Sequence, residues 1–186
     1  MAEFTIADTH FFCQCAIDLH QRPFADAASM SSEMIRRWNA AVGPDDTVYH
    51  LGDVASFRRK QTAVEFLRAL NGTKILIVGN HDRGKQDEFW RACGFTEIHW
   101  QPHNHPLVIL SHIPVRRPER LNIHGHIHCR PYHYTGDVEL FRCVSADRTG
   151  FAPILLETAL KGGCTWKSGC ESCMHYRDDR GDTSGS

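Results

Sequence analysis

Five short motifs, each at the end of an apolar, strand-like run, constrain the fold of this chain more than any other feature. In chain order they are Asp8-Thr9-His10, Gly52-Asp53, Gly79-Asn80-His81-Asp82, Ser111-His112 and Gly125-His126-Ile127-His128. In open α/β sheets, ligands collect beyond the carboxyl ends of the strands. The motifs therefore predict strands that end at a common edge, where Asp, Asn and His side chains gather.

The first half of the chain alternates strand-like and helix-like segments, whereas the second half is mostly strand-like. Residues 74–78 form an unbroken apolar run, which predicts a strand buried on both faces and a sheet covered by helices. We expect an α/β fold of two sheets with helices outside. The expected strands cover 4–7, 47–51, 74–78, 96–100, 107–110, 121–124, 138–144 and 153–156, and the expected helices cover 31–42, 59–70 and 86–93.

The length and composition of the chain predict one domain. A chain of 186 residues with 41% hydrophobic residues can bury one substantial core, which we assign to residues 1–161. From residue 162 to 186 the chain is rich in Cys, Gly, Ser and charge, and we expect a flexible tail. The formal net charge of -1 does not favour tight, nonspecific nucleic-acid binding, but it leaves a nucleotide substrate open.

The cellular location is predicted from what the N-terminus lacks. It shows no basic and apolar leader, and no apolar run approaches the ~18 residues of a membrane span, so we expect a cytoplasmic protein. The eight cysteines are then expected to be reduced thiols. For Cys93, Cys129 and Cys143 we expect packing as small apolar side chains. For Cys13 and Cys15 packing is favoured over a soft-metal or redox site.

The residue types in the motifs suit divalent metal ions. Mixed imidazole and carboxylate ligation favours first-row divalent cations. Asp8 and His10 are two residues apart, so both project to one side if the chain stays extended. The same spacing recurs in the last motif. Asp53 offers two oxygens that could bridge two ions, and Asn80 offers a neutral oxygen.

Taken in order, the motifs resemble the pattern of the calcineurin-like metallophosphoesterase superfamily, which runs D-x-H, G-D, G-N-H-[DE], H and G-H-x-H. The resemblance covers roughly residues 4–157, and the segments 48–54 and 122–128 are similar to small, single-domain bacterial and phage members. It implies a four-layer α/β/β/α sandwich, in which two mixed β-sheets are flanked by helices, and a dinuclear metal centre.

The resemblance also implies a division of the ligands between two ions. One ion would take Asp8, His10, Asp53 and His128. The other would take Asp53, Asn80, His112 and His126, with Asp53 as the bridge. His81 matches the residue that stabilises the transition state or protonates the leaving group, and Asp82 would orient and charge-tune its imidazole. The expected catalytic residues are therefore His81, Asp82 and Asp53.

The implied reaction is hydrolysis of a small phosphomonoester or phosphodiester, with nucleotide-type substrates or nucleic-acid ends favoured. A hydroxide that bridges the two cations would attack phosphorus. Mn²⁺ is the expected metal, and Fe, Zn²⁺, Co²⁺ or Ni²⁺ would also suit these ligands. The alternatives are a non-catalytic metal-binding module of the same fold that binds other proteins, and a nucleic-acid-binding protein that works through its tail.

The chain departs from the small branch of the family directly after His10. Many relatives continue Phe-Gly-His, whereas this chain continues Phe11-Phe12-Cys13-Gln14-Cys15, so the additional His is absent. Gln14 or Cys13 is expected to occupy its place. This departure concerns a substrate contact rather than the metal ligands.

Further candidates lie outside the motifs. Besides Asn80, the arginines Arg83, Arg116 and Arg117 are candidates for binding a substrate phosphate, with a solvated basic loop as the alternative. In the tail, Cys-x5-Cys-x2-Cys-x-His spacing permits a structural zinc site, although a flexible tail is favoured. Its four ligands would be Cys164, Cys170, Cys173 and His175.

Overall fold

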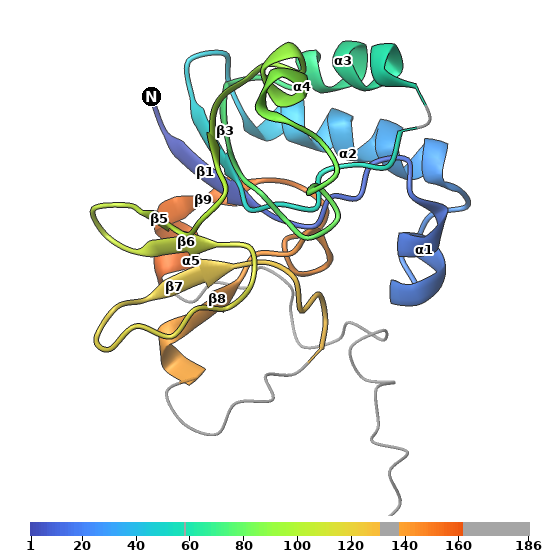
Figure 1. Ribbon diagram of the computed structural model, residues 1–186. Coiled ribbons are helices and arrows are strands. Elements are labelled where there is room, and N and C mark those ends of the chain that lie inside the picture. The colour runs from blue at the N-terminus through green and yellow to red at the C-terminus, as the bar shows by residue number, and fades with distance from the viewer. Residues whose placement is uncertain (58, 131–137, 162–186) are drawn as a thin grey trace, which may run out of the picture.

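The computed structural model describes residues 1–57, 59–130 and 138–161 (Figure 1). The tail from residue 162 onward, with its candidate zinc ligands, lies outside the described residues. Among the helices that are described, none is long and apolar enough to cross a membrane.

The larger sheet has five strands in the order β4-β3-β2-β1-β9. Strands β1 to β4 run parallel to their neighbours, and β9 lies antiparallel to β1. Their carboxyl ends therefore lie at one edge. The bounds are β1 Glu3–Ile6, β2 Thr47–His50, β3 Thr73–Ile77, β4 Phe95–His99 and β9 Ile154–Leu155.

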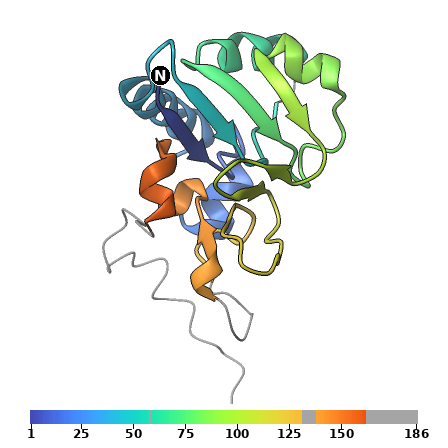
Figure 2. The ribbon, with the colours of Figure 1, turned by 90° about the vertical axis from the view of Figure 1, so that its left-hand side faces the viewer.

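The smaller sheet has four strands in the order β5-β6-β7-β8. Strands β6, β7 and β8 are parallel, and β5 is antiparallel to β6. The bounds are β5 His103–Asn104, β6 Ile109–Ser111, β7 Asn122–His124 and β8 Phe141–Cys143. Both sheets are mixed, so the predicted α/β fold of two mixed sheets flanked by helices is confirmed (Figures 1 and 2).

Two apolar cores hold these layers together. One lies between the larger sheet and the helices, where Met34, Trp38 and Leu67 pack on Leu76. The other lies between the two sheets, where Ile75 and Ile77 meet residues of the smaller sheet. Because alternate side chains of a strand point to opposite faces, β3 contributes to both cores. The prediction of a strand buried on both faces is confirmed.

The helices are more numerous than the sequence pattern predicts. The structure has α1 Gln14–His20, α2 Ala27–Ala41, α3 Lys60–Arg68, α4 Asp87–Ala92, α5 Leu156–Leu160 and 3₁₀ turns at Val138–Leu140 and Ala146–Arg148. Helices α3 and α4 are shorter than expected, whereas α2 is longer. Helices α1 and α5 and strand β5 are not predicted, because segments this short contain too few residues to show a clear helical or strand period. Residues 138–144 were expected to be one strand, but their first three residues form a 3₁₀ turn.

The start of α2 lies four residues before its expected start. Asp26 is the N-cap, and its carboxylate accepts a hydrogen bond of 2.7 Å from the amide of Ser29. The Ser29 hydroxyl and the Asp26 backbone complete a capping box. Ser31, the expected first residue of the helix, lies inside it. Its buried hydroxyl donates to the carbonyl of Ala27 and accepts from the amide of Phe12.

His50 makes the stability of the metal-free protein depend on pH. It is buried on β2, where its Nε2 lies 2.9 Å from the Thr9 hydroxyl, and burial lowers its pKa from 6.5 to about 3. Below pH 6.5 the unfolded chain therefore binds a proton that the folded chain excludes. The stability contribution is complete above pH 6.5 and is lost as the pH falls, by about 1.4 kcal/mol between pH 7.5 and 5.5.

We expect His50→Gln to remove this part of the pH dependence. Glutamine can still bond the Thr9 hydroxyl but does not titrate. Guanidinium unfolding of the metal-free protein at the two pH values should show a fall in unfolding free energy that is about 1.4 kcal/mol smaller in the variant. Other buried histidines contribute equally to both proteins, so the difference isolates His50. Equal falls in the two proteins would contradict the prediction.

Candidate metal centre

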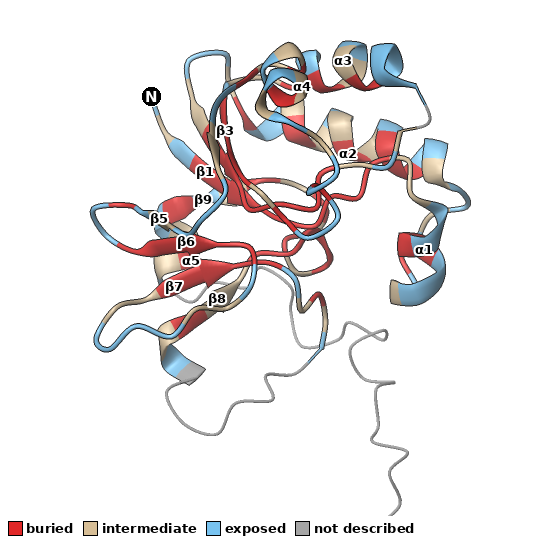
Figure 3. Cartoon of the chain, in the orientation of Figure 1, coloured by how far each residue is buried: buried red, intermediate tan, exposed pale blue. Residues whose placement is uncertain are grey.

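The loops that follow five strands meet between the two sheets and bring all seven predicted metal ligands together. β1, β2 and β3 lead to Asp8 and His10, to Asp53 and to Asn80, and β6 and β7 lead to His112 and to His126 and His128. Figure 3 shows that buried residues continue from the strands of the larger sheet into the loops at their ends. The ligand loops are therefore part of the packed interior.

Two groups of buried side chains have the geometry of metal sites. In the first, one ligand atom each of Asp8, His10 and His128 lies within 4.8 Å of the others. In the second, Asp8, Asp53 and His112 meet the same limit. Asp8 belongs to both groups. Its Oδ1 lies 3.9 Å from Nδ1 of His112 and 4.0 Å from Nε2 of His128.

Asp53 faces both groups with a single oxygen. Its Oδ2 lies 3.7 Å from Nε2 of His10 and 3.4 Å from Nε2 of His112. Its Oδ1 accepts a hydrogen bond of 2.9 Å from the amide of His81. This position suits the expected bridging role, which stays a prediction.

Asn80 and His126 extend the second group. The side-chain oxygen of Asn80 lies 2.8 Å from Nε2 of His112 and 3.0 Å from Nδ1 of His126. His126 also donates its backbone amide to Oδ2 of Asp8, at 2.8 Å. The three side chains thus converge on one point beside Asp53.

The buried carboxylate of Asp8 supports the presence of a cation. None of the described residues forms a hydrogen bond with its Oδ1, although this atom is buried. Burial raises the pKa of Asp8, while the neighbouring His128 and His112 oppose the rise. An unpartnered buried carboxylate oxygen is energetically costly, and a divalent cation would offset that cost. The donor set around it therefore fits the metal that the motifs predict.

Two of the imidazoles are held in the way that metal-binding histidines usually are. Nδ1 of His112 lies 2.8 Å from the carbonyl of Leu51, and Nδ1 of His128 lies 2.8 Å from Oδ2 of Asp147. Such contacts fix the proton on Nδ1 and leave Nε2 free to bind a cation. Both rings therefore present Nε2 to the centre.

A buried ion pair that the motifs do not contain supports this arrangement. Arg22 donates two hydrogen bonds of 2.9 Å to the carboxylate of Asp147, and it also bonds the carbonyls of Asp8, at 2.7 Å, and Thr9, at 2.9 Å. Burial would raise the pKa of Asp147, but Arg22 and His128 together hold it well below its usual range. The sequence carries one signal for Asp147, because it too follows a strand end, β8.

The backbone at the ligands is strained. Five of the seven predicted ligands have positive φ: Asp8 (54°), His10 (47°), Asp53 (55°), His126 (71°) and His128 (49°). Residues other than glycine rarely adopt this region, and such strain concentrates at functional sites. The premise that an extended chain aligns Asp8 with His10 is therefore wrong. Left-handed backbone conformations, held by hydrogen bonds between the loops of Asp8 and Asp53, aim these side chains instead.

Glycines within the motifs allow the loops to approach closely. A Cβ on Gly125 would lie 2.5 Å from Cβ of Ala7 and 2.7 Å from Oδ2 of Asp8. A Cβ on Gly52, whose φ is +87°, would lie 2.5 Å from the amide nitrogen of Gly79. No side chain fits at either position without displacing the ligand loops.

The role expected for Asp82 needs correction. Its buried carboxylate accepts hydrogen bonds from the amides of Asp53 (2.7 Å), Val54 (3.0 Å) and Gly79 (3.0 Å). These bonds fix the backbone that carries Asp53, and no hydrogen bond among the described residues joins Asp82 to the imidazole of His81. The His81 side chain is 68% exposed, and its Nε2 lies 3.9 Å from Oδ2 of Asp53.

The arginine candidates for phosphate binding lie at the surface. Arg83, Arg116 and Arg117 are exposed, and their contact with a substrate stays a prediction. Gln14 does not take the place of the missing histidine, because its side chain bonds Asp18 and the amide of Ala27.

The sulfur atoms of Cys13 and Cys15 lie against each other, so the expectation of plain packing does not describe this pair, and the expectation of reduced thiols stays a prediction. Cys13 is the N-cap of α1 and Cys15 lies in its first turn, which brings their Cα atoms to 5.4 Å. Among the other cysteines that the structure describes, Cys93 is buried and Cys129 and Cys143 are half-buried.

A histidine that the motifs do not include lies beside the centre. His20, the last residue of α1, stacks on the ring of His128 with a centroid distance of 3.6 Å and an interplanar angle of 13°. Burial lowers the pKa of His20 to about 4. Nothing in the local sequence distinguishes this histidine, because only the return of α1 onto the centre gives it this neighbour.

Comparisons with known proteins agree with the geometry. Two curated relatives are an uncharacterized protein of Methanocaldococcus jannaschii, 40% identical over 81 residues, and the Gene 66 protein of Mycobacterium phage L5, 28% identical over 138 residues. The first alignment covers 43% of this chain and 46% of the relative, and the second covers 55% and 66%. The chain thus spans less than two thirds of either relative.

Two solved structures share the fold. A protein of unknown function from Aquifex aeolicus is 25% identical with a TM-score of 0.64, over 86% of this chain and 98% of its own. The nuclease MPE of Pseudomonas putida is 20% identical with a TM-score of 0.50, over 68% and 61%. The family model described as calcineurin-like phosphoesterase matches residues 5–149, which include every predicted ligand. The chain therefore belongs to the calcineurin-like phosphoesterase family.

Proposed function

We propose that this protein is a dinuclear metal-dependent phosphoesterase that hydrolyses small phosphate esters, with nucleotides as the favoured substrates. The observation that carries the proposal is the pair of buried ligand groups that share Asp8, whose Oδ1 has no other partner among the described residues. Family membership supports the same reaction class.

The ligands divide between two cations. Asp8, His10 and His128 would hold one, and His112, Asn80 and His126 would hold the other, with Oδ2 of Asp53 facing both. Mixed nitrogen and oxygen donors suit Mn²⁺, our first choice, and also Fe, Zn²⁺, Co²⁺ or Ni²⁺. Two bound cations would lower the pKa of a water and neutralise charge on the phosphoryl oxygens.

His81 is the residue best placed to act on the substrate directly. Its side chain is exposed, yet its ring centroid lies 5.3 Å from that of His10 and its backbone is tied to Asp53. From this position its imidazole can donate a hydrogen bond to a phosphoryl oxygen or a proton to the departing oxygen. Asp82 supports it indirectly, because its carboxylate ties the loop of Asp53 to the loop of His81.

We expect His81→Ala to lower kcat by ~100-fold or more while the metal content stays unchanged. The protein is stripped of metal, supplied with Mn²⁺ and assayed with p-nitrophenyl phosphate and bis-p-nitrophenyl phosphate, and bound metal is measured by elemental analysis. His99→Ala, on β4 and outside the ligand groups, is the matched control and should retain wild-type activity. Comparison of the two substrates also shows whether monoesters or diesters are preferred.

Two outcomes would contradict the proposal. Wild-type protein that binds two ions per chain but hydrolyses neither ester with any of the candidate metals would be a non-catalytic member of the family. Protein that binds no metal under these conditions would refute the dinuclear centre itself.

A further inference from the structure

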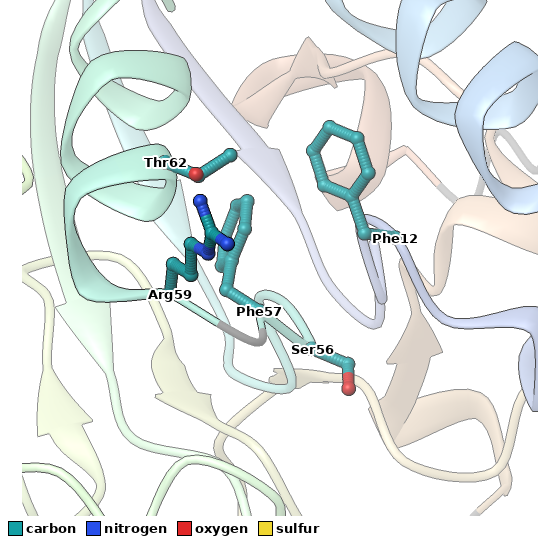
Figure 4. Close-up of a pocket in the computed structure, with 5 residues that line it drawn as sticks. All are labelled: Phe12, Ser56, Phe57, Arg59 and Thr62. Atoms are coloured by element: carbon teal, nitrogen blue, oxygen red, sulfur yellow. The ribbon is translucent and has the colours of Figure 1, made fainter.

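A pocket of about 320 Å³ lies next to the loops that carry Asp8, His10 and Asp53 (Figure 4). It is lined by Phe12, Ser56, Phe57, Arg59 and Thr62. The roles derived above use none of these five side chains. The pocket therefore calls for its own explanation.

The walls of the pocket continue directly from the metal ligands. Phe12 follows His10 by two residues and Ser56 follows Asp53 by three. Because a residue spans at most ~3.6 Å, the Cα of Phe12 lies within about 7 Å of that of His10, and the Cα of Ser56 within about 11 Å of that of Asp53. A small molecule can thus reach from one site to the other.

Hydrogen bonds hold these two wall segments together. The amide of Phe11 donates to the carbonyl of Val54 at 2.9 Å, and the amide of Ser56 donates to the carbonyl of Phe11 at 2.8 Å. The amide of Phe12 also donates to the Ser31 hydroxyl at 2.8 Å. The pocket and the ligand loops are therefore one fixed unit.

Aromatic rings form the apolar part of the pocket. The ring centroids of Phe12 and Phe57 are 5.1 Å apart and tilted by 46°. Phe66, which does not line the pocket, packs against both rings, with its ring centroid 4.8 Å from that of Phe12 and 6.1 Å from that of Phe57. Phe12 and Phe57 are only half-buried. Supported rings with partly exposed surfaces can stack on a flat ligand group.

The remaining lining side chains are polar. Figure 4 shows Phe12 on one side of the pocket, and Phe57, Arg59 and Thr62 on the other. Ser56, Arg59 and Thr62 are exposed, and they offer two hydroxyls and a guanidinium. These groups can hydrogen-bond the edge of a heteroaromatic ring or pair with a phosphate. A purely aliphatic group would leave them without partners.

We propose that this pocket holds the base of a nucleotide whose phosphate lies at the metal centre. The inference rests on the proposed function, because the metal centre supplies the phosphate site from which the base reaches the pocket. Phe57 stacks on the base, and the hydroxyls and Arg59 bond its edge. A free nucleotide and the end of a nucleic-acid strand present the same base, so the recognised chemistry is the same for both.

The test measures equilibrium binding to the Mn²⁺-loaded protein. Two hydrolysis-resistant ligands are compared by calorimetry: adenosine 5′-methylenephosphonate and methylphosphonate, which share the anionic group and differ in the nucleoside. We expect wild-type protein to bind the nucleoside ligand more tightly. Phe57→Ala should weaken its binding by about 5- to 150-fold, the effect of one lost stacking contact, and leave methylphosphonate binding unchanged.

A second variant tests the pocket without removing a ring that packs against its neighbours. Thr62→Phe adds a ring at an exposed position of α3 that lines the pocket, so it should block the base without loss of apolar contacts. Gln61→Phe adds the same ring one residue earlier, outside the lining, and should bind as wild type does. Equal affinity of wild-type protein for both ligands, or no effect of Phe57→Ala and Thr62→Phe, would overturn the proposal.

Hydrolysis of p-nitrophenyl phosphate by the same preparations separates this inference from the proposed function. Active protein that does not distinguish the two phosphonates retains the proposed function and refutes the base pocket. Inactive protein that prefers the nucleoside ligand refutes the proposed function and retains the pocket. A short single-stranded oligonucleotide is then tested as a competitor of the nucleoside ligand. If it binds more tightly than the mononucleotide ligand, the base belongs to the end of a strand, and if it binds more weakly, the base belongs to a free nucleotide.

Discussion

Replacement of Asp53 by asparagine should lower metal-dependent hydrolysis by ~100-fold or more. The two side chains have the same shape, and asparagine keeps an oxygen that can accept the His81 amide in place of Oδ1. What is lost is the negative charge on Oδ2, which lies between His10 and His112 and faces both ligand groups. An amide NH₂ at this point would repel a cation on either side.

The measurement combines kcat on p-nitrophenyl esters with the number of metal ions bound per chain. Asp45→Asn, at an exposed carboxylate in the turn before β2, is the matched control and should behave as wild type. Asp53→Asn should lose at least one bound ion as well as activity. A variant that keeps two ions and hydrolyses within threefold of the wild-type rate would exclude Asp53 as the bridge.

Replacement of Arg22 by methionine should lower the unfolding free energy of the metal-free protein by about 3–5 kcal/mol. Arg22 is buried, and it forms the ion pair with Asp147 while it bonds the carbonyls of Asp8 and Thr9. Without it, the buried carboxylate of Asp147 and two buried carbonyls lose their partners. Methionine fills part of the volume but offers no donor.

Guanidinium unfolding followed by circular dichroism measures this effect. Arg36→Met is the matched control, because the Arg36 side chain is 66% exposed in its ion pair with Glu33, and its loss should change stability little. A loss of less than about 1 kcal/mol for Arg22→Met would contradict the assigned role. Asp147 would then be stabilised by other groups, such as His128.

β3 was predictable because it is a continuous apolar run that is buried on both faces. Its end and the ends of β1 and β2 each lead to a motif, which marked where these strands stop. The start of α2 was predictable in principle, because Asp26 and Ser29 form a capping box. It was missed because this capping box precedes the apolar positions from which the helix was predicted. The short helices α1 and α5 could not be predicted, since so few residues are stabilised mainly by what they pack against.

At the site, the convergence of the candidate ligands was predictable, but the contacts around them were not. Asp147 lies 125 residues from Arg22, and no local pattern pairs them. His20 acquires its contact with His128 only when α1 returns to the centre. Asp82 was assigned to the neighbouring His81 because the two are adjacent in sequence, whereas its carboxylate bonds amides on the loop of Asp53.

The sequence alone determined which donors reach the edge of the sheets, because residue type and the ends of apolar runs are local properties of the chain. Only the tertiary structure decided how these donors are aimed. It holds five ligands at positive φ, leaves Oδ1 of Asp8 without a hydrogen bond among the described residues, and places Asp8 in both ligand groups. The physical reason is that strain and an unpaired oxygen persist only where contacts between distant segments outweigh their cost.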